Sequence, residues 1–180
     1  MTRPSYTIES RVVMFTDVHE FSIVMSILGE RQYDFLQTIY ERLGEHIIAH
    51  RGEILKYLGD GMLCVFPENA AVDAVQCALT LRHVYAELVQ AWDISHPTEL
   101  EIGISAGEVA IGVFGHSSLR IKDMFSDIVC QAAAIGHHLG VAITEPVYGM
   151  IKSNFATCAL PDRQLKWQPE PLRVWEIVED

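Results

Sequence analysis

The sequence lacks the features of a disulfide scaffold, of a structural zinc site and of a membrane protein. Its four cysteines, Cys64, Cys77, Cys130 and Cys158, have no C-x-x-C spacing and lie mostly in apolar runs. We therefore expect reduced, buried thiols. No uncharged run approaches the roughly 20 residues of a membrane helix, and residues 1–15 show no signal-peptide pattern. These absences predict a cytoplasmic protein with no membrane partner.

The chain also has few basic residues. It carries 13 Lys and Arg against 24 Asp and Glu, which gives a formal net charge of −11, and it has no basic run. Because this charge repels a polyanion, we expect no nucleic acid partner. A small phosphate ligand that arrives with divalent cations is still compatible. The Walker A pattern and the dinucleotide-binding glycine fingerprint are both absent.

The 180 residues, of which 49% are hydrophobic, suffice for a full core, so we expect one domain over residues 1–180. The apolar patterns and glycines predict these elements in order: a strand at 10–18, a short helix from about 18, a helix at 30–50, a hairpin at 54–66, a helix at 69–92, two strands at 100–115, a polar loop at 116–125, a helix from 126 to Gly140 and a short C-terminal strand. This order fits an α+β domain with a ferredoxin-like antiparallel sheet and helices on one face.

Two aspartates at predicted strand ends carry the first hypothesis about function. Asp17 ends the first strand, and Asp60 lies in the Gly-Asp-Gly turn of the hairpin. In a ferredoxin-like sheet the first strand lies beside that hairpin, so the two carboxylates can share one or two Mg²⁺ or Mn²⁺ ions, as phosphoryl chemistry requires. Taken singly, Asp17 is better explained as a helix cap and Asp60 as a turn former, but the two together favour a metal site.

The segment after Asp17 offers a second, weaker signal. Residues 17–22, DVHEFS, are expected to start a helix, and the free N–H groups of its first turn attract phosphate. Every strand-to-helix junction offers the same groups, so this signal is unspecific. Lys56 alone is typical of a solvated edge strand. We interpret His137 and His138, which are expected at a helix C-terminus, as structural residues.

Four segments together resemble the class III adenylate/guanylate cyclase catalytic domain. They are VVMFTDVHEFS, GEILKYLGDGMLCVF, IGISAGEVAIGVFG and LKWQPEPLRVWEI, and they span nearly the whole chain in order. The resemblance implies the class III nucleotide cyclase fold and the formation of a cyclic nucleotide and pyrophosphate with two Mg²⁺ or Mn²⁺ ions. It also implies sites between two domains packed head to tail, in a homodimer or in a heterodimer with a second cyclase domain.

The resemblance implies roles for seven residues near the first strand and hairpin. Asp17 and Asp60 match the family's two metal ligands. The backbone from Val18 to Phe21, together with Ser22, matches the turn that holds the β- and γ-phosphates.

Further positions match the groups that read the base and the triphosphate. Lys56 and Asp123 match the pair that reads the purine edge. A lysine donor beside an aspartate acceptor suits adenine, whose N1 accepts and whose N6 donates, so ATP is the expected nucleoside triphosphate; a pyrimidine remains open because the pair tests only edge complementarity. Lys166 matches a lysine that reaches the triphosphate from the partner subunit.

The helix expected from residue 126 departs from the family pattern Gly-Asp-x-Val-Asn-x-Ala-x-Arg. This chain has SDIVCQAAA, so Cys130 replaces the catalytic asparagine that orients the ribose, and Ala134 replaces the catalytic arginine that stabilises the transition state. Cysteine is a poor hydrogen-bond donor and the alanine side chain is none. In addition, Glu20 replaces the glycine of the phosphate turn, and Glu101 stands where an arginine is common.

Two functions therefore remain open. The first is a nucleotide cyclase, weak or compensated, in which Gln131, Arg120 or Lys122, or a partner chain, replaces the missing pair. The second is a catalytically silent cyclase-like module that dimerises and binds or senses a nucleotide. Retention of the metal aspartates and of the base-reading pair favours the enzyme, whereas the substitutions at 130 and 134 favour the module.

Overall fold

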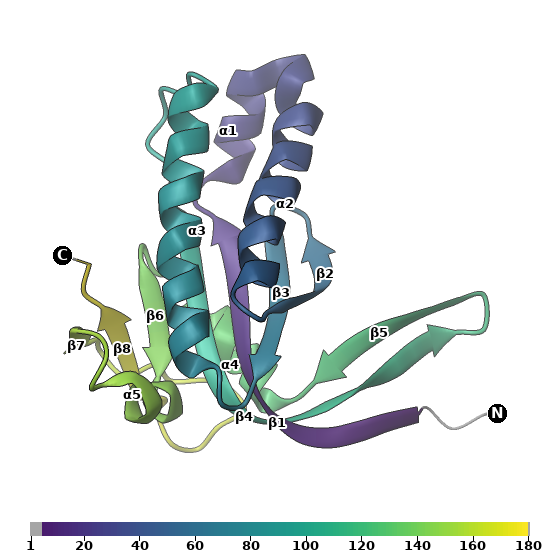
Figure 1. The fold of residues 1–180 in the computed structure, drawn as a ribbon, viewed down its shortest axis with the longest axis vertical. Coiled ribbons are helices and arrows are strands. Elements are labelled where there is room, and N and C mark those ends of the chain that lie inside the picture. The colour runs from purple at the N-terminus through teal and green to yellow at the C-terminus, as the bar shows by residue number, and fades with distance from the viewer. Residues whose placement is uncertain (1–4, 180) are drawn as a thin grey trace.

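The computed structural model describes residues 5–179, which fold around one central sheet (Figure 1). Its elements in chain order are β1 (Ser5–Val18), α1 (Phe21–Leu28), the 3₁₀ helix η1 (Gly29–Arg31), α2 (Gln32–Ala49), β2 (Glu53–Leu58), β3 (Gly61–Pro67), α3 (Ala71–Ala91), β4 (Leu100–His116), β5 (Leu119–Phe125), α4 (Asp127–Ile135), β6 (Val141–Thr144), α5 (Glu145–Ile151), β7 (Thr157–Ala159) and β8 (Val174–Ile177). The predicted α+β class is confirmed.

The sheet has the strand order β2-β3-β1-β4-β6-β8-β7, and β5 pairs with β4 off this path. The pairs are antiparallel except for β4 and β6, which run parallel. The central strands β1 and β4 stay in register from Ser5 opposite Val113 to Val18 opposite Leu100. This register places the end of β1, where Asp17 lies, beside the start of β4.

The two faces of the sheet are covered by different helices. Because alternate residues of a strand point to opposite faces, Val12 and Met14 of β1 pack into the large core with α1, α2 and α3. Val13 points the other way and packs with Ile128 and Ala132 of α4. The long helices therefore lie on one face, as predicted, and the short helix α4 adds a layer on the opposite face (Figure 1).

The hairpin predicted within residues 100–115 is wrong, because this segment is the single strand β4. Gly107, the expected turn residue, instead pairs with Arg11 in the middle of β4. Its small size serves packing, since a Cβ atom there would lie 2.8 Å from Cδ1 of Ile128. The loop predicted at 116–125 is also wrong: Leu119–Phe125 forms β5, whose alternating apolar residues pair with β4.

The predicted long helices α2 and α3 are present, but the predicted start of the short helix α1 is wrong. Buried Ile39 and Leu43 lie on the inner face of α2, as their spacing predicted. Helix α1, however, begins at Phe21 rather than near Val18. The reason is that Glu20 adopts left-handed backbone angles, φ 53° and ψ 36°, and ends the extended chain there.

Helix α4 begins as predicted and ends early. The Oγ atom of Ser126 accepts a hydrogen bond from the backbone N–H two residues on, at 3.1 Å, which makes Ser126 the N-cap. The helix ends at Ile135, not at Gly140. His137 and His138 consequently lie beyond the helix, in the connection to β6, and are free to face the sheet edge.

The predictions based on absent features have mixed outcomes. All four cysteines are free thiols, as expected, but only Cys64 and Cys77 are buried, whereas Cys130 and Cys158 are exposed. Burial raises the pKa of the Cys77 thiol to about 12. Within residues 5–179, no helix combines the length and the apolar character needed to cross a bilayer.

The β4–β5 hairpin extends away from the body of the molecule as an arm, and the first half of β1 follows it (Figure 1). We call this part the arm: residues 5–10 and 110–125. Its exposed apolar side chains are Tyr6, Ile8, Val113, Leu119, Ile121 and Phe125. An exposed apolar surface of this kind is typical of an interface with another protein.

Candidate active site

The β2–β3 turn is held against the end of β1 by two hydrogen bonds. The N–H of Val18 donates to Oδ2 of Asp60 at 3.1 Å, and the N–H of Met62 donates to Oγ1 of Thr16 at 3.1 Å. The approach needs a glycine after the aspartate, because a Cβ atom at Gly61 would lie 2.5 Å from the carbonyl oxygen of Thr16. The turn chemistry of the hairpin thus fixes where the Asp60 carboxylate lies.

The structure brings Asp17 and Asp60 together, as the sequence predicted. Burial, the neighbouring charge of Asp60 and a side-chain hydrogen bond between the two carboxyls together raise the pKa of Asp17 to about 6. Two carboxyls in such contact repel as anions unless they share a proton or a cation. Their oxygen donors fit Mg²⁺ or Mn²⁺, and metal binding by this pair stays a prediction.

Two further side chains, which sequence reasoning did not place here, lie beside Asp17. Glu101 faces Asp17 across the β1–β4 pair and is only 6% exposed. Nδ1 of His137 lies 3.7 Å from Oδ2 of Asp17 and 3.7 Å from Oε2 of Glu101. The unusual acidic residue at 101 was visible in the sequence. His137 was interpreted there as a structural residue, because its approach to Asp17 depends on where α4 ends.

The predicted phosphate turn has fewer free backbone N–H groups than the resemblance implied. The N–H of Val18 is taken by Asp60, and that of His19 donates to the carbonyl of Glu99 at 2.9 Å. The N–H groups of Phe21 and Ser22, in the first turn of α1, precede the first intrahelical bonds and remain the natural phosphate donors.

Glu20, whose carboxylate would oppose phosphate binding, is directed elsewhere. Its Oε2 lies 2.6 Å from Nε2 of His96, in the connection between α3 and β4. This contact engages the Glu20 carboxylate with a side chain outside α1. The substitution at this position is therefore compatible with a bound anion.

Lys56 and Asp123 form an ion pair, as the predicted base-reading pair requires. Nζ of Lys56 lies 2.8 Å from the Asp123 carboxylate, and Asp123 is only 7% exposed. The N–H of Met124 donates to Oδ1 of Asp123 at 2.8 Å, and the Lys56 ammonium lies 5.8 Å from the centre of the Phe125 ring. These contacts orient one donor and one acceptor side by side.

The residues matched to the transition state and to the triphosphate lie on α4 and on the segment between β7 and β8. Cys130 is exposed on α4, Ala134 is half-buried on the same helix, and Lys166 is exposed in the segment between β7 and β8. Nη2 of Arg163, from that segment, donates to the carbonyl oxygen of Ala134 at 3.4 Å. A guanidinium therefore lies beside the helix position where the family's arginine is missing.

The three proposed substitutes for the missing pair have other contacts. Gln131 is buried and accepts a hydrogen bond from Oγ of Ser105 at 3.0 Å. Lys122 forms an ion pair with Glu53 at 2.7 Å, and Arg120 lies in the arm. The hydrogen bond to Ser105 engages the Oε1 acceptor of Gln131, and its role as a replacement stays a prediction.

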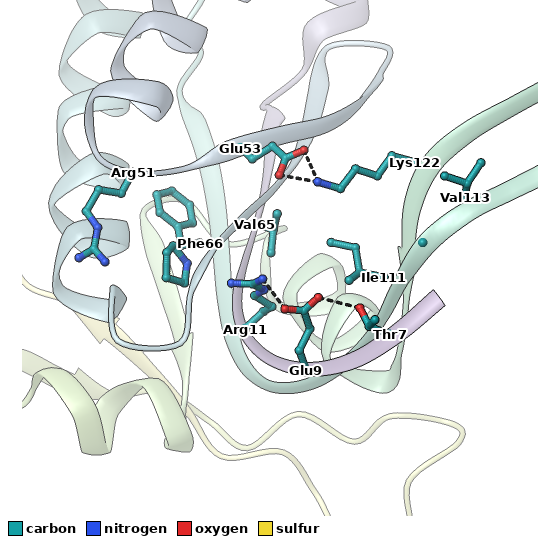
Figure 2. Close-up of a pocket in the computed structure, with 12 residues that line it drawn as sticks. Thr7, Glu9, Arg11, Arg51, Glu53, Val65, Phe66, Ile111, Val113 and Lys122 are labelled. Carbon is teal, nitrogen blue, oxygen red and sulfur yellow. Dashed lines mark hydrogen bonds and ion pairs between the residues drawn. The ribbon is translucent and has the colours of Figure 1, made fainter. Parts of the chain in front are cut away.

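A cavity of about 400 Å³ lies between β1, β2, β3 and the arm, separate from the candidate active site (Figure 2). None of the predicted metal, phosphate or base-reading residues lines it. Its charged side chains are already paired: Glu9 with Arg11, Glu53 with Lys122 and, outside the cavity, Asp73 with Arg51. This cavity therefore offers no uncompensated charge to a nucleotide.

Comparison with known proteins agrees with this geometry. Residues 4–172 match the sequence model of the family described as the adenylate and guanylate cyclase catalytic domain. A putative adenylate cyclase 3 of Rhizobium meliloti is 24% identical over 97% of this chain, which covers 29% of that protein. Human adenylate cyclase type 10 is 23% identical over 63% of this chain and 8% of its own length. The chain thus spans less than a third of these relatives.

Solved structures share the fold. The adenylyl cyclase CyaB from P. aeruginosa superposes with a TM-score of 0.92 at 21% identity, covering 98% of this chain and 97% of that one. The guanylyl cyclase Cya2 gives 0.84 at 19% identity, covering 96% and 93%. The guanylate cyclase domain of RhGC from Catenaria anguillulae, in complex with GTP, gives 0.81 at 20% identity, covering 96% and 98%.

We expect Asp17→Asn to stabilise the metal-free protein at neutral pH. The pKa of Asp17 rises from its ordinary value of 3.8 to about 6 on folding, so ionisation opposes folding, and the penalty grows as the pH rises through that window. The side chain is 28% exposed. After allowance for solvent screening, we expect Asp17→Asn to increase the free energy of unfolding by about 1–2 kcal/mol. Urea unfolding from about pH 4 to about pH 8 measures it; a difference between variant and wild type that does not grow with pH would contradict the prediction.

Proposed function

The chain belongs to the adenylate and guanylate cyclase catalytic domain family, and we propose that it converts ATP into 3′,5′-cyclic AMP and pyrophosphate as one catalytic domain over residues 1–180. The observation that carries the proposal is the meeting of Asp17 and Asp60 at the end of β1, beside the first turn of α1. Carboxylates held together in this way serve a cation-dependent reaction better than they serve folding.

The donor set of the site fits two Mg²⁺ or Mn²⁺ ions, held by Asp17 and Asp60. When bound, such ions neutralise phosphate oxygens and lower the pKa of the ribose 3′-hydroxyl. The N–H groups of Phe21 and Ser22 donate to the β- and γ-phosphates. With the triphosphate so oriented, the 3′-hydroxyl gives its proton to solvent water and its oxygen forms a bond to the α-phosphorus. The bond from the α-phosphorus to the oxygen that bridges to the β-phosphate breaks, and pyrophosphate leaves with that electron pair.

Recognition of the base is assigned to Lys56 and Asp123. The ammonium donates to N1 of adenine and the carboxylate accepts from N6, and the ion pair between them holds both groups ready before the base arrives. Guanine presents the opposite pattern of donors and acceptors at this edge. Adenine is therefore the preferred base.

The active unit of the proposal is a head-to-tail dimer, as a homodimer or with a second cyclase domain. The apolar arm gives each chain a surface that a second domain can cover. In this arrangement Lys166 of one chain reaches the triphosphate held at Asp17 and Asp60 of the other. Arg163, which contacts the backbone of Ala134, is on the same segment and adds a second cation.

A catalytically silent, nucleotide-binding module is the second candidate. One observation favours it: Cys130 and Ala134 occupy the positions of the family's asparagine and arginine, and neither side chain offers a strong donor. Loss of one transition-state donor typically lowers the rate by about 10²–10³. Such a module would retain binding at the same residues and lose turnover.

A nucleotide assay separates the two candidates. We expect the purified chain to form cyclic AMP from MnATP faster than it forms cyclic products from MnGTP, MnCTP or MnUTP. Asp17→Ala and Asp60→Ala should each lower kcat by at least about a hundredfold, because the cations supply several kcal/mol of transition-state stabilisation. Asp34→Ala, which removes an exposed carboxylate from α2, is the control. Binding of MnATP without turnover would support the module instead.

Restoring the family's side chains on α4 tests whether they limit the rate. We expect the double variant Cys130→Asn/Ala134→Arg to raise kcat about tenfold or more, because it returns a ribose donor and a transition-state cation. The matched control is Cys130→Asn/Ala134→Met, in which position 134 gains length without charge. If both double variants have the wild-type kcat, the departures at these positions do not limit turnover.

The arm provides the test of dimerisation. Leu119 is 69% exposed at the arm, and Leu119→Asp should weaken self-association about tenfold or more, because it adds a charge to an apolar contact. Ile48→Asp, at a residue 68% exposed on α2, is the matched control. Sedimentation equilibrium measures the association, and specific activity should rise with protein concentration in parallel. An arm variant that associates like the wild type would argue against this interface.

A further inference from the structure

Glu101 is a buried carboxylate without a strong cationic partner. It is 6% exposed, and among residues 5–179 the side chains that pair with it are those of His19 and His137, with no Lys or Arg. Burying a carboxylate is costly unless a cation or several hydrogen bonds compensate it. Glu101 stands where an arginine is common in the family, so this chain has a carboxylate in place of a cation directly opposite Asp17.

One oxygen of Glu101 is held by His19, and the other lies near His137. Nδ1 of His19 lies 2.8 Å from Oε1 of Glu101, which orients the carboxylate. Oε2 lies 3.7 Å from Nδ1 of His137. The arrangement resembles a ligand carboxylate held by an outer hydrogen bond, with His19 as the positioning residue.

His137 supplies a nitrogen donor to the same point. Its Nδ1 is equidistant, at 3.7 Å, from Oδ2 of Asp17 and Oε2 of Glu101. Donor atoms of the three side chains all lie within 4.8 Å of one another. Ligand atoms about 2.1 Å from a common ion lie about 3–4 Å apart, so these atoms need only small movements to share one. The His137 side chain is 59% exposed and has room for that movement.

We propose that Glu101 and His137 join Asp17 as ligands of one divalent cation, in a mixed nitrogen and oxygen site that prefers Mn²⁺ or another transition metal ion over Mg²⁺. The preference follows from the donors, because imidazole suits first-row transition metals whereas Mg²⁺ favours oxygen ligands and water. The inference rests on the proposed metal role of Asp17 and adds two ligands and a metal preference to it.

Calorimetric titration of the nucleotide-free full chain with MnCl₂ and with MgCl₂ tests the proposal. We expect Mn²⁺ to bind about tenfold or more tightly than Mg²⁺, and Glu101→Gln and His137→Ala each to weaken Mn²⁺ binding about tenfold or more. His137→Ala should leave Mg²⁺ binding nearly unchanged. The controls are Glu108→Gln, an exposed carboxylate on the same strand, and His83→Ala, an exposed histidine on α3.

A spectroscopic measurement keeps the test independent of folding in the Glu101 variant. Pulsed electron paramagnetic resonance of the Mn²⁺-loaded wild type should show nitrogen hyperfine coupling, and His137→Ala should lose it while His83→Ala retains it. Absence of that coupling in the wild type, or Mn²⁺ affinities unchanged by Glu101→Gln and His137→Ala, overturns the inference.

The experiments distinguish failure of the added metal ligands from failure of the proposed cyclase function. If Asp17→Ala loses Mn²⁺ binding and turnover while the Glu101 and His137 variants keep wild-type Mn²⁺ affinity, the cyclase proposal stands and the added ligands are rejected. If the chain turns over no nucleotide but Mn²⁺ binding depends on Glu101 and His137, the cyclase proposal fails and the added ligands stand.

Discussion

The site depends on one constraint: the β2–β3 turn must approach the end of β1 closely enough for the Val18 N–H to reach Asp60. That approach places two carboxyls in contact, and burial together with the nearby Asp60 carboxyl raises the pKa of Asp17 to about 6. It also requires Gly61, where any side chain would meet the β1 backbone. The fold therefore carries an electrostatic penalty at this point, and a bound cation is the natural way to remove it.

Much of the fold could be predicted, because local patterns determined it. The Gly-Asp-Gly turn between apolar runs specified the hairpin, and the apolar spacing of α2 specified its buried face. The single strand β4 was missed because Gly107 looks like a turn residue in isolation. Its extended conformation is imposed by pairing with β1 along its whole length, a long-range interaction that sequence periodicity does not report.

Some contacts of the candidate site could be predicted because sequence motifs indicate which residues become neighbours. Others could not, because they depend on the register of strand pairing. The contact of Asp17 with Asp60 followed from the expected position of the hairpin beside the first strand, and the pair of Lys56 with Asp123 followed from the family resemblance. Glu101 was recognised as unusual, but its position opposite Asp17 follows only from the β1–β4 register. The approach of His137 follows from the early end of α4 and has no local signature.

The carboxylates at the end of β1 constrain the order in which a cation and a nucleotide could bind. Asp17, Asp60 and Glu101 gather three carboxyls beside the first turn of α1, in a chain whose formal net charge is −11. A polyanionic triphosphate that approached these carboxyls without cations would meet strong repulsion at short range. In the proposed cyclase reaction, divalent cations would therefore have to precede the nucleotide or arrive with it. Glu101, in place of an arginine, would make this dependence stronger, because it adds a carboxylate where a fixed cation could have substituted for the metal ion.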